Sequence, residues 1–326
     1  MSPKAGLLYL SLADTRRLLA WREVIACLAR AYERAGDPRA APPRVVARSD
    51  GMWLRALTAI SGTGACMGAK IIAKGRPNSA DHFIALWDTA SGALACLLDG
   101  KYVTAMRTAG TTAVAIDRIA HAGPLRVAIL GSGREAQTHV QATAAVRTIA
   151  SLAVYSPTRE NRERFASRFS DELSIPCRAA ETARAAVDGA DLIIAAARSH
   201  DETPILQGAW LRPGVLVASI GSTVPEQREV DPEVVRRAHV IVADVPEEVA
   251  YETGDMMAAR AAGVDFESRM IALSDLVCGR EKVSQRVDDI VLFKSVGSGL
   301  QDIAVSELCL AKAREKGIGT VLPVGD

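Results

Sequence analysis

A glycine-containing loop between a predicted strand and a predicted helix constrains the fold of this chain more than any other feature. The apolar run Leu125–Leu130 predicts the strand, the loop at 131–136 reads G-S-G-R-E-A, and a helical pattern follows. A G-x-G-x-x-A pattern in this setting is typical of the turn that holds the diphosphate of a dinucleotide. Gly131 permits the tight turn, Gly133 lets the backbone approach the diphosphate, and Ala136 keeps the helix close to the sheet.

Strands and helices alternate after this loop. The expected elements are strands at 152–155, 191–195, 215–220 and 240–243 and a helix at 160–169. Such alternation predicts βαβ units around a parallel sheet. Aromatic residues make up only 4% of the chain, and aliphatic residues dominate, as in sheets that are buried on both faces. We therefore predict an α/β fold with a Rossmann dinucleotide-binding domain.

The N-terminal third has a different pattern. The expected elements are a strand at 7–12, a helix capped by Asp14 or Thr15 and extending to about Arg34, short β-rich runs between Arg44 and Leu98, and a helix at 104–120. An amphipathic helix from about Gly299 to Lys316 ends the pattern. The first third is therefore a strand-rich α+β domain.

Length and charge narrow the class of partner. The 326 residues correspond to two domains of ordinary size. The chain has 39 Lys and Arg against 38 Asp and Glu, so its charge gives no reason to expect nucleic acid or a membrane as partner. The six cysteines show no metal-ligand or disulfide spacing, and no metal is expected. These features predict a cytoplasmic protein that binds a small molecule.

The residues after the second strand of the Rossmann pattern bear on the choice of cofactor. An acidic residue there would bind the ribose 2′-hydroxyl of NAD, but this chain has Tyr155-Ser156-Pro157-Thr158-Arg159. Ser156, Thr158 and Arg159 offer hydroxyl groups and a guanidinium suited to a 2′-phosphate. NADP(H) is therefore favoured over NAD(H), which stays an alternative.

Three basic residues stand among apolar or small residues, where cations are seldom buried without a partner. They are Arg44, Lys70 and Arg107. An enzyme that acts on small amino or keto acids needs such cations, because arginine pairing orients a carboxylate beside the reacting carbon.

Several motifs resemble those of the ornithine cyclodeaminase/mu-crystallin family. They lie at 92–110, 131–137, 217–222, 228–231, 292–297 and 312–320. The resemblance extends from about residue 7 to 322. It implies a homodimer of chains in which residues 1–117 and 299–326 form a substrate-binding and dimerisation domain and residues 118–298 form the Rossmann domain.

The resemblance also implies roles for individual residues. Arg44, Lys70 and Arg107 would line the substrate site, with Lys70 beside the reacting carbon and both arginines on the carboxylate. The residues implied or predicted to bind the cofactor are Thr108, Gly131, Ser132, Gly133, Arg134, Glu135, Ala136, Ser156, Thr158, Arg159, Ser222, Lys294, Ser295 and Gly297. Ser222 and Thr223 would also contact the substrate, and Asp302 on the last helix is expected to be structural.

One position bears on the reaction. Family members that release ammonia are expected to have an aspartate where this chain has Thr223. Threonine does not titrate near pH 7. The pair Ser222-Thr223 is similar to the residues at these positions in the ketimine reductases of the family, which also lack the aspartate. The expected reaction is reduction of a cyclic ketimine carboxylate, Δ1-pyrroline-2-carboxylate or Δ1-piperideine-2-carboxylate, to proline or pipecolate. Lys70 or a water molecule would supply the proton.

The sequence is also compatible with other functions. Within enzymes they are an ornithine cyclodeaminase, an alanine-dehydrogenase-like enzyme and an amino-acid synthase of the siderophore type. A shifted alignment around Thr223 would give Glu226 or Glu229 the role of the missing aspartate. A protein that binds NADPH and a small ligand without turnover is the non-enzymatic alternative.

Overall fold

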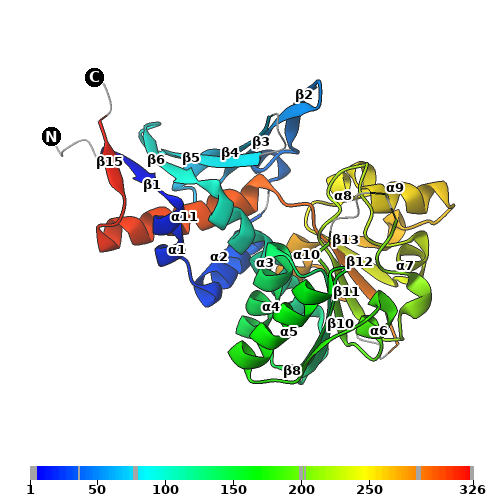
Figure 1. Cartoon of the computed structure of the whole chain (residues 1–326). Coiled ribbons are helices and arrows are strands. Elements are labelled where there is room, and N and C mark those ends of the chain that lie inside the picture. The colour runs from blue at the N-terminus through cyan, green and yellow to red at the C-terminus, as the bar shows by residue number, and fades with distance from the viewer. Residues whose placement is uncertain are drawn as a thin grey trace. The chain divides into compact units, whose positions relative to one another are not determined.

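The structure is a computed structural model that describes residues 6–35, 37–75, 80–197, 201, 203–283 and 288–323. The chain divides into two compact units, which consist of Met1–Thr111 with Gly297–Asp326 and of Thr112–Val296 (Figure 1). The boundaries expected from the sequence are 117/118 and 298/299. Among the described residues, no helix is long and apolar enough to cross a lipid bilayer.

The first unit is built on a seven-stranded sheet with the order β15-β1-β6-β5-β4-β3-β2. Strands β1 and β6 are parallel, and the other neighbours are antiparallel. The strands are β1 (Leu7–Leu10), β2 (Val45–Ser49), β3 (Met52–Ile60), β4 (Cys66–Lys74), β5 (Ala80–Asp88), β6 (Leu94–Asp99) and β15 (Thr320–Leu322). The helices are α1 (Leu12–Leu18), α2 (Trp21–Glu33), η1 (Pro38–Ala40), α3 (Gly100–Ile119), which continues into the second unit, and α11 (Gly299–Lys316).

Two helices follow β1 where the sequence predicts a single one. The side chain of Ser11 accepts a hydrogen bond from the Asp14 backbone N–H, and the Asp14 carboxylate accepts one from the Ser11 N–H. This capping box makes Ser11 the N-cap, so the predicted cap at Asp14 or Thr15 is wrong. The backbone is extended at Leu19 and Ala20, and α2 therefore begins separately.

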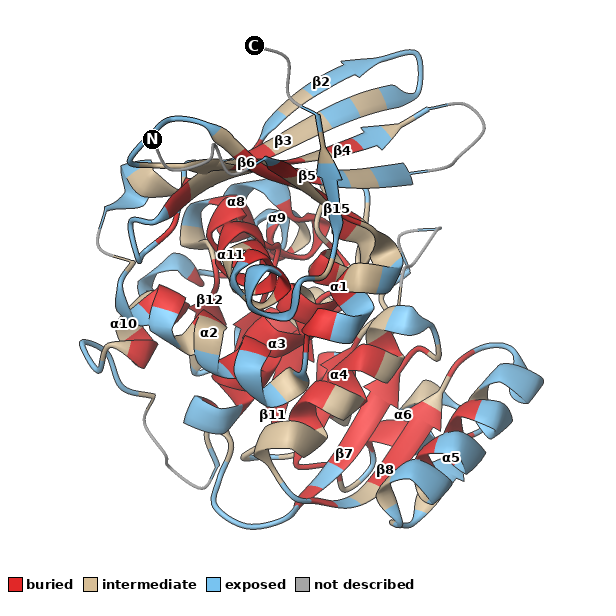
Figure 2. Cartoon of the chain, turned by 90° about the vertical axis from the view of Figure 1, so that its left-hand side faces the viewer, coloured by how far each residue is buried: buried red, intermediate tan, exposed pale blue. Residues whose placement is uncertain are grey.

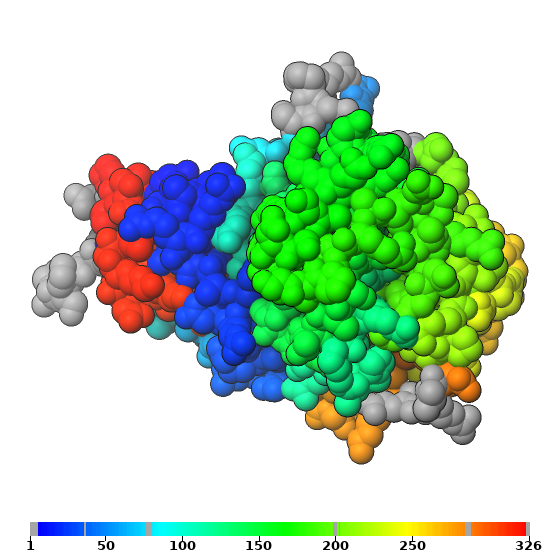
Figure 3. All heavy atoms as spheres, turned by 60° about the horizontal axis from the view of Figure 1, so that its bottom comes forward, coloured from blue at the N-terminus to red at the C-terminus, as the bar shows by residue number. Residues whose placement is uncertain are grey.

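Helix α11 is the core helix of the first unit and has the bounds that the sequence predicts. Most of its residues are buried (Figure 2), and it packs against α2 and against β3, β4 and β5. Gly68 on β4 permits the close approach, because a Cβ there would lie 2.7 Å from the Cδ1 atom of Ile303. Strand β15 then pairs with β1, so the C-terminal segment (red) lies against the N-terminal segment (blue) in Figure 3.

The second unit contains an eight-stranded sheet of parallel strands. The strands are β7 (Leu125–Leu130), β8 (Ile149–Tyr155), β9 (Cys177–Ala179), β10 (Leu192–Ala195), β11 (Leu216–Ser219), β12 (Val240–Ala243), β13 (Met270–Ala272) and β14 (Val291–Lys294). The helices are α4 (Arg134–Val146), α5 (Arg159–Leu173), α6 (Ala183–Val187), η2 (Gly208–Trp210), α7 (Pro232–Arg237), α8 (Pro246–Glu252), α9 (Gly254–Ala261), η3 (Glu267–Arg269) and α10 (Leu273–Val277).

The order of this sheet is β13-β12-β14-β11-β10-β7-β8-β9. Starting from β7, the next strands along the chain, β8 and β9, lie on one side, and β10 and β11 lie on the other. The direction of winding thus reverses between β7 and β10. In open parallel sheets, ligands bind at the carboxyl ends of the strands at such a switch point. The predicted α/β class and Rossmann topology are confirmed.

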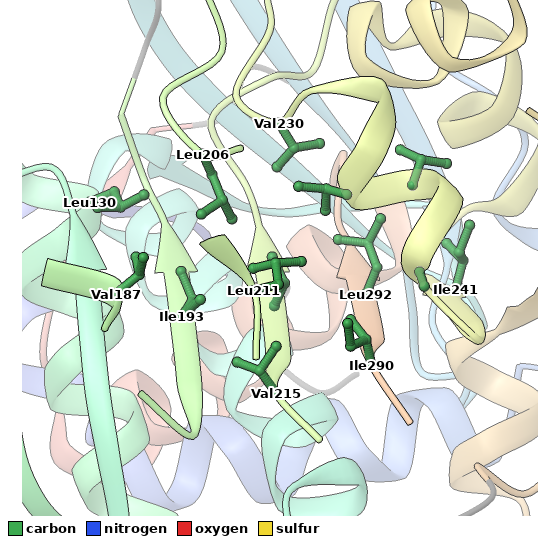
Figure 4. Close-up of a cluster of buried hydrophobic side chains, with 14 of the residues drawn as sticks. Leu130, Val187, Ile193, Leu206, Leu211, Val215, Val230, Ile241, Ile290 and Leu292 are labelled. Atoms are coloured by element: carbon green, nitrogen blue, oxygen red, sulfur yellow. The ribbon is translucent and has the colours of Figure 1, made fainter. Parts of the chain in front are cut away.

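Aliphatic side chains fill the interior of this unit. Many of them belong to a buried cluster that extends from β7 to β12 (Figure 4). Leu130, Ile193, Val217 and Leu292 are each at most 1% exposed. A continuous core therefore holds these strands in place. The loops at their carboxyl ends, where a ligand would bind, start from a rigid support.

Candidate functional site

The first unit brings two of the predicted cations to one buried carboxylate. Lys70 lies on β4, and its Nζ atom forms an ion pair with Oδ2 of Asp302 on α11 at 2.6 Å. Both side chains are fully buried. Although the pair is close, the Nζ atom has no aligned hydrogen-bond partner among the described residues. A buried ammonium of this kind can still donate to a ligand.

Arg107 on α3 is the second cation. Its Nε donates to Oδ1 of Asp302 at 3.0 Å, and its Nη1 donates to Oε1 of Gln301 at 2.9 Å. The amide of Gln301 in turn donates to the hydroxyl of Tyr32 at 2.8 Å. Gly297 has a φ of +81°, and a Cβ there would lie 2.9 Å from the Cζ of Arg107, so only glycine leaves room for this guanidinium.

The electrostatics of this group favour an anionic ligand. Arg44, directly before β2, is 9% exposed, and its charge is felt at Lys70. Burial and the charges of Arg107 and Arg44 together lower the pKa of Lys70 to about 7, while Asp302 opposes the change. Lys70 and Arg107 thus share one carboxylate, and the charge of Arg44 acts on the same group. A carboxylate ligand would balance their charge.

The sequence did not predict that Asp302 is part of the cationic site. It is fully buried, so it is not a solvated side chain, and it holds both Lys70 and Arg107. The sequence does carry a signal for it, because an aspartate on the apolar face of a helix is seldom buried without a cationic partner. The identity of that partner depends on chain segments that are far apart.

His82 is a second residue that the sequence did not indicate. Its Nδ1 lies 3.2 Å from the hydroxyl of Thr104. Burial, with the charges of Lys70 and Arg107, lowers the pKa of His82 to about 4, so the imidazole is neutral at pH 7. Thr108, expected to touch the cofactor phosphates, donates its hydroxyl to the backbone oxygen of Thr104 in its own helix.

The glycine loop of the second unit connects β7 to α4. Gly131 has a φ of +117°, and a Cβ there would lie 2.8 Å from the Ala196 oxygen, so glycine is required. A Cβ on Gly133, the N-cap of α4, would meet nothing within 4 Å, so the outer side of the loop is open. Ala136 is fully buried, and Ser132 donates its hydroxyl to Ser156 at 3.0 Å. An open loop before a helix N-terminus fits the diphosphate of a dinucleotide.

The residues expected at the adenosine end lie close to this loop. Ser156 is buried beside Ser132, and Thr158 is the N-cap of α5 with no side-chain capping bond. Arg159 is exposed, and its Nε forms an ion pair with Glu163 at 2.7 Å. Arg134 and Glu135 occupy the first turn of α4. The described part of β8 and the turn after it, residues 149–158, contains no carboxylate.

The other predicted cofactor residues lie at the carboxyl edge of the same sheet. Ser222 is buried and donates its hydroxyl to the Gln227 oxygen. Thr223 beside it is half-buried. Ser295 donates to Oδ2 of Asp244 at 2.7 Å. The ammonium of Lys294 is fully buried, and it contacts Asp255 and Ser219 inside the unit.

Glu229 does not take the role of the missing aspartate. Its carboxylate is fully buried and accepts hydrogen bonds from Ser219 and from the backbone of Ile220 and Ala197. It is thus committed to the strand ends and does not offer an acid to a substrate. Among the described residues, no group of three His, Cys, Asp or Glu side chains could hold a metal ion, and the six cysteines are free thiols.

The fold and the glycine loop are those of a dinucleotide-binding α/β protein, and the first unit contains a buried group of cationic side chains. A family model described as the ornithine cyclodeaminase/mu-crystallin family matches residues 13–317. The chain belongs to this family, which confirms the resemblance in the motifs.

Individual relatives are similar over most of the chain. The structure of Thermococcus litoralis Δ1-pyrroline-2-carboxylate reductase in complex with NADH and L-proline superimposes with a TM-score of 0.90 at 30% identity, and the match covers 97% of this chain and 100% of that chain. The ketimine reductase mu-crystallin of Mus musculus is 30% identical over 225 residues, which are 69% of this chain and 67% of the relative. A Δ1-pyrroline-2-carboxylate reductase of Bacillus cereus (strain ZK / E33L) is 29% identical over 238 residues, with 72% of each chain covered.

Proposed function

We propose that this chain is an oxidoreductase that reduces a cyclic ketimine carboxylate, Δ1-pyrroline-2-carboxylate or Δ1-piperideine-2-carboxylate, to proline or pipecolate. The observation that carries the proposal is the buried contact of Lys70 and Arg107 with Asp302 under the influence of Arg44. This group combines a net positive charge for a carboxylate with an ammonium that can lose its proton near neutral pH. The names of the relatives support the same reaction.

Each side chain of the cationic site has a role in the proposed reaction that follows from its chemistry. Arg44 and Arg107 hold the substrate carboxylate and so fix the face of the imine ring. The ammonium of Lys70, with a pKa of about 7, holds a proton at Nζ and can give it to the imine nitrogen. Asp302 keeps Lys70 and Arg107 in place. A nicotinamide cofactor, when bound, supplies the hydride that adds to the carbon of the C=N bond.

The second unit holds the cofactor in this proposal. Gly131, Ser132, Gly133 and the first turn of α4 bind the diphosphate. We further propose a preference for NADP(H), because Ser156, Thr158 and Arg159 offer donors for a 2′-phosphate and no carboxylate stands among them. The pair between Arg159 and Glu163 is exposed and therefore weak, so the guanidinium is able to exchange its partner.

We also propose that the chain acts as a homodimer. Large apolar side chains of the first unit are exposed, among them Val45, Leu54 and Val321 at 72%, 49% and 68%. Burial of such side chains between two copies would remove apolar surface from water. Analytical ultracentrifugation tests this proposal, and a monomer at micromolar concentration would contradict it.

A substrate panel tests the proposed reaction. Purified protein is mixed with NADPH or NADH and with each cyclic imine, and the loss of absorbance of the reduced cofactor is followed. In parallel, ornithine is supplied with NAD, and ammonia is measured. Oxidation of the cofactor by an imine supports the proposal. Ammonia release from ornithine without imine reduction would instead identify a cyclodeaminase, and binding without any turnover would identify a ligand-binding protein.

A further inference from the structure

Four buried side chains, together with the backbone N–H of Glu229, form a closed hydrogen-bonded ring at the carboxyl edge of the parallel sheet. The carboxylate of Glu229 accepts from the hydroxyl of Ser219 at 2.8 Å, and that hydroxyl accepts from Nζ of Lys294 at 2.8 Å. Lys294 also pairs with Oδ2 of Asp255 at 2.6 Å. Asp255 closes the ring, because its Oδ1 accepts from the backbone N–H of Glu229 at 2.8 Å and of Val230 at 3.2 Å.

Each member of the ring comes from a different part of the second unit. Ser219 ends β11, Lys294 ends β14, Asp255 lies in the first turn of α9, and Glu229 lies in the segment before α7. All four side chains are fully buried. Ionised groups without contact to water cost several kcal/mol each unless they are paired, so a ring of this kind holds its elements in one arrangement.

Glu229 extends the ring to the loops that follow two neighbouring strands. Its Oε2 accepts from the backbone N–H of Ile220 at 2.8 Å, and its Oε1 accepts from the N–H of Ala197 at 3.1 Å. Ile220 follows β11, and Ala197 follows β10. One carboxylate therefore ties the two loops together.

The loop after β11 lies directly against this carboxylate. At Gly221 a Cβ would lie 2.9 Å from the Cδ of Glu229, so the backbone passes the carboxylate at a distance that excludes any side chain. Ser222 and Thr223 follow immediately. The position of this segment is thus coupled to Glu229, and the buried side chains of Ile220 and Ser222 also hold it.

The place of the ring in the sheet indicates what it positions. The diphosphate loop follows β7, on one side of the point where the winding reverses, and Glu229 holds the ends of β10 and β11 on the other side. A dinucleotide that binds across such a switch point places its adenosine half on the side of β7 and its nicotinamide half on the side of β10 and β11.

We propose that Glu229 is a positioning residue for the nicotinamide half of the cofactor. It holds the backbone of residues 220–223, and this backbone in turn positions the nicotinamide. The inference rests on the proposed function, because it needs a nicotinamide cofactor in the second unit. Lys294 and Asp255 hold the segment that carries Glu229. The hydroxyl of Ser219 links the ammonium of Lys294 to the carboxylate of Glu229 by hydrogen bonds. No member of the ring needs to touch the substrate.

The charges that face Glu229 agree with a role in positioning. They come from Lys294 on β14 and Asp255 on α9, and they act in opposite directions on its carboxylate. Burial and the charge of Asp255 raise the pKa of Glu229 to about 7, while Lys294 and the hydrogen bonds from Ser219 and Gly221 oppose the change. The ionised form is the one that can accept all of these hydrogen bonds at once.

The test compares a whole cofactor with the same molecule without nicotinamide. The variant is Glu229→Gln, and the matched control is Glu233→Gln, whose side chain pairs with Arg236 at the surface. Calorimetry first shows whether the unmodified chain binds NADH or NADPH more tightly. The Kd of that cofactor is then compared with the Kd of its nicotinamide-free counterpart, which is ADP-ribose for NADH and 2′-phospho-ADP-ribose for NADPH. Because Gln keeps one oxygen and loses the other acceptor, we expect the cofactor Kd to rise about tenfold in Glu229→Gln and the Kd of the counterpart to change by less than about twofold.

Ser219→Ala carries the test if Glu229→Gln does not fold. It removes the hydroxyl between Lys294 and Glu229, and we expect the same selective loss with a smaller, about threefold, change. An equal loss for both ligands, or no loss in either variant, would overturn the role of Glu229 and leave the proposed function standing. Failure of the unmodified chain to bind NADPH and NADH would refute the proposed function itself.

Discussion

Asp302→Asn is the substitution that examines the cationic site most closely. The aspartate lies 2.6 Å from Nζ of Lys70 and 3.0 Å from Nε of Arg107. Its negative charge raises the pKa of Lys70, which burial and the two arginines have lowered to about 7. Loss of this charge must therefore lower the pKa of Lys70 further.

The size of the effect follows from the distance. At an effective dielectric constant of about 20, opposite charges about 4 Å apart attract by about 4 kcal/mol, or about three pKa units, and the 2.6 Å contact of Lys70 with Asp302 is closer than that. Relaxation and water entry will offset part of this, so we expect a fall of about one to three units. The acid that protonates the imine is then available only at lower pH, and kcat/KM declines from a correspondingly lower pH.

The assay is the pH profile of kcat/KM for cofactor oxidation with a cyclic imine. The substrate's own titration is common to both proteins, so the difference between the profiles reports the enzyme. Asp117→Asn, an exposed position on the helix that carries Arg107, is the matched control. A high-pH limb that stays in place in Asp302→Asn while activity persists would refute the assignment of Lys70 as the acid under the control of Asp302.

Asp302→Asn also has a consequence for stability. Two buried cations lose their counter-charge, for which we expect a cost of about 3–5 kcal/mol in the free energy of unfolding. Lys70 can release its proton above pH 7, so the cost should be smaller at pH 8.5 than at pH 6. Urea unfolding at the two pH values measures this difference, and equal losses at both would contradict the reasoning.

Three further predictions concern other parts of the chain. Lys70→Ala should lower kcat by about 100-fold or more while the Kd of the cofactor, measured by fluorescence, changes little, and an active Lys70→Ala protein would remove the proposed proton donor. Arg159→Ala should raise the Kd of NADPH about tenfold and leave that of NADH nearly unchanged, whereas equal changes for both would contradict the 2′-phosphate contact. Asp191→Asn should lower the free energy of unfolding at pH 7 by about 1–2 kcal/mol, since Asp191 pairs with Arg126 and Arg212, which are partly open to solvent. The pKa of Asp191 is lowered from 3.8 to about 2, so its contribution is present above pH 4 and is lost as the pH falls towards 2, and a variant equally stable at pH 7 would refute it.

Local sequence signals predicted elements of both units well. The strand at Leu125–Leu130 and the final helix at Gly299–Lys316 have the bounds that their apolar patterns predict. The glycine loop was predictable because its residues have requirements within a few positions of each other. Gly131, for example, needs a positive φ that few other residues adopt.

Long-range contacts account for what the sequence could not predict. The break at Leu19 and Ala20 has neither glycine nor proline to mark it, and strand β6 lacks a clear alternation of exposed and buried residues. The pairing of Lys70 with Asp302 joins residues more than 200 positions apart. The ring around Glu229 likewise depends on four separate elements. Burial and partner become apparent only when the chain is folded.

Isotope transfer tests the central claim most directly. Reduced cofactor with deuterium at both C4 positions of the nicotinamide is incubated with Δ1-pyrroline-2-carboxylate or Δ1-piperideine-2-carboxylate, and the product is examined by mass spectrometry and NMR. We predict proline or pipecolate with one deuterium at Cα, and little or no amino acid from Lys70→Ala over the same time. Unlabelled product, or no amino acid from either imine while ornithine releases ammonia, would contradict the proposed reduction.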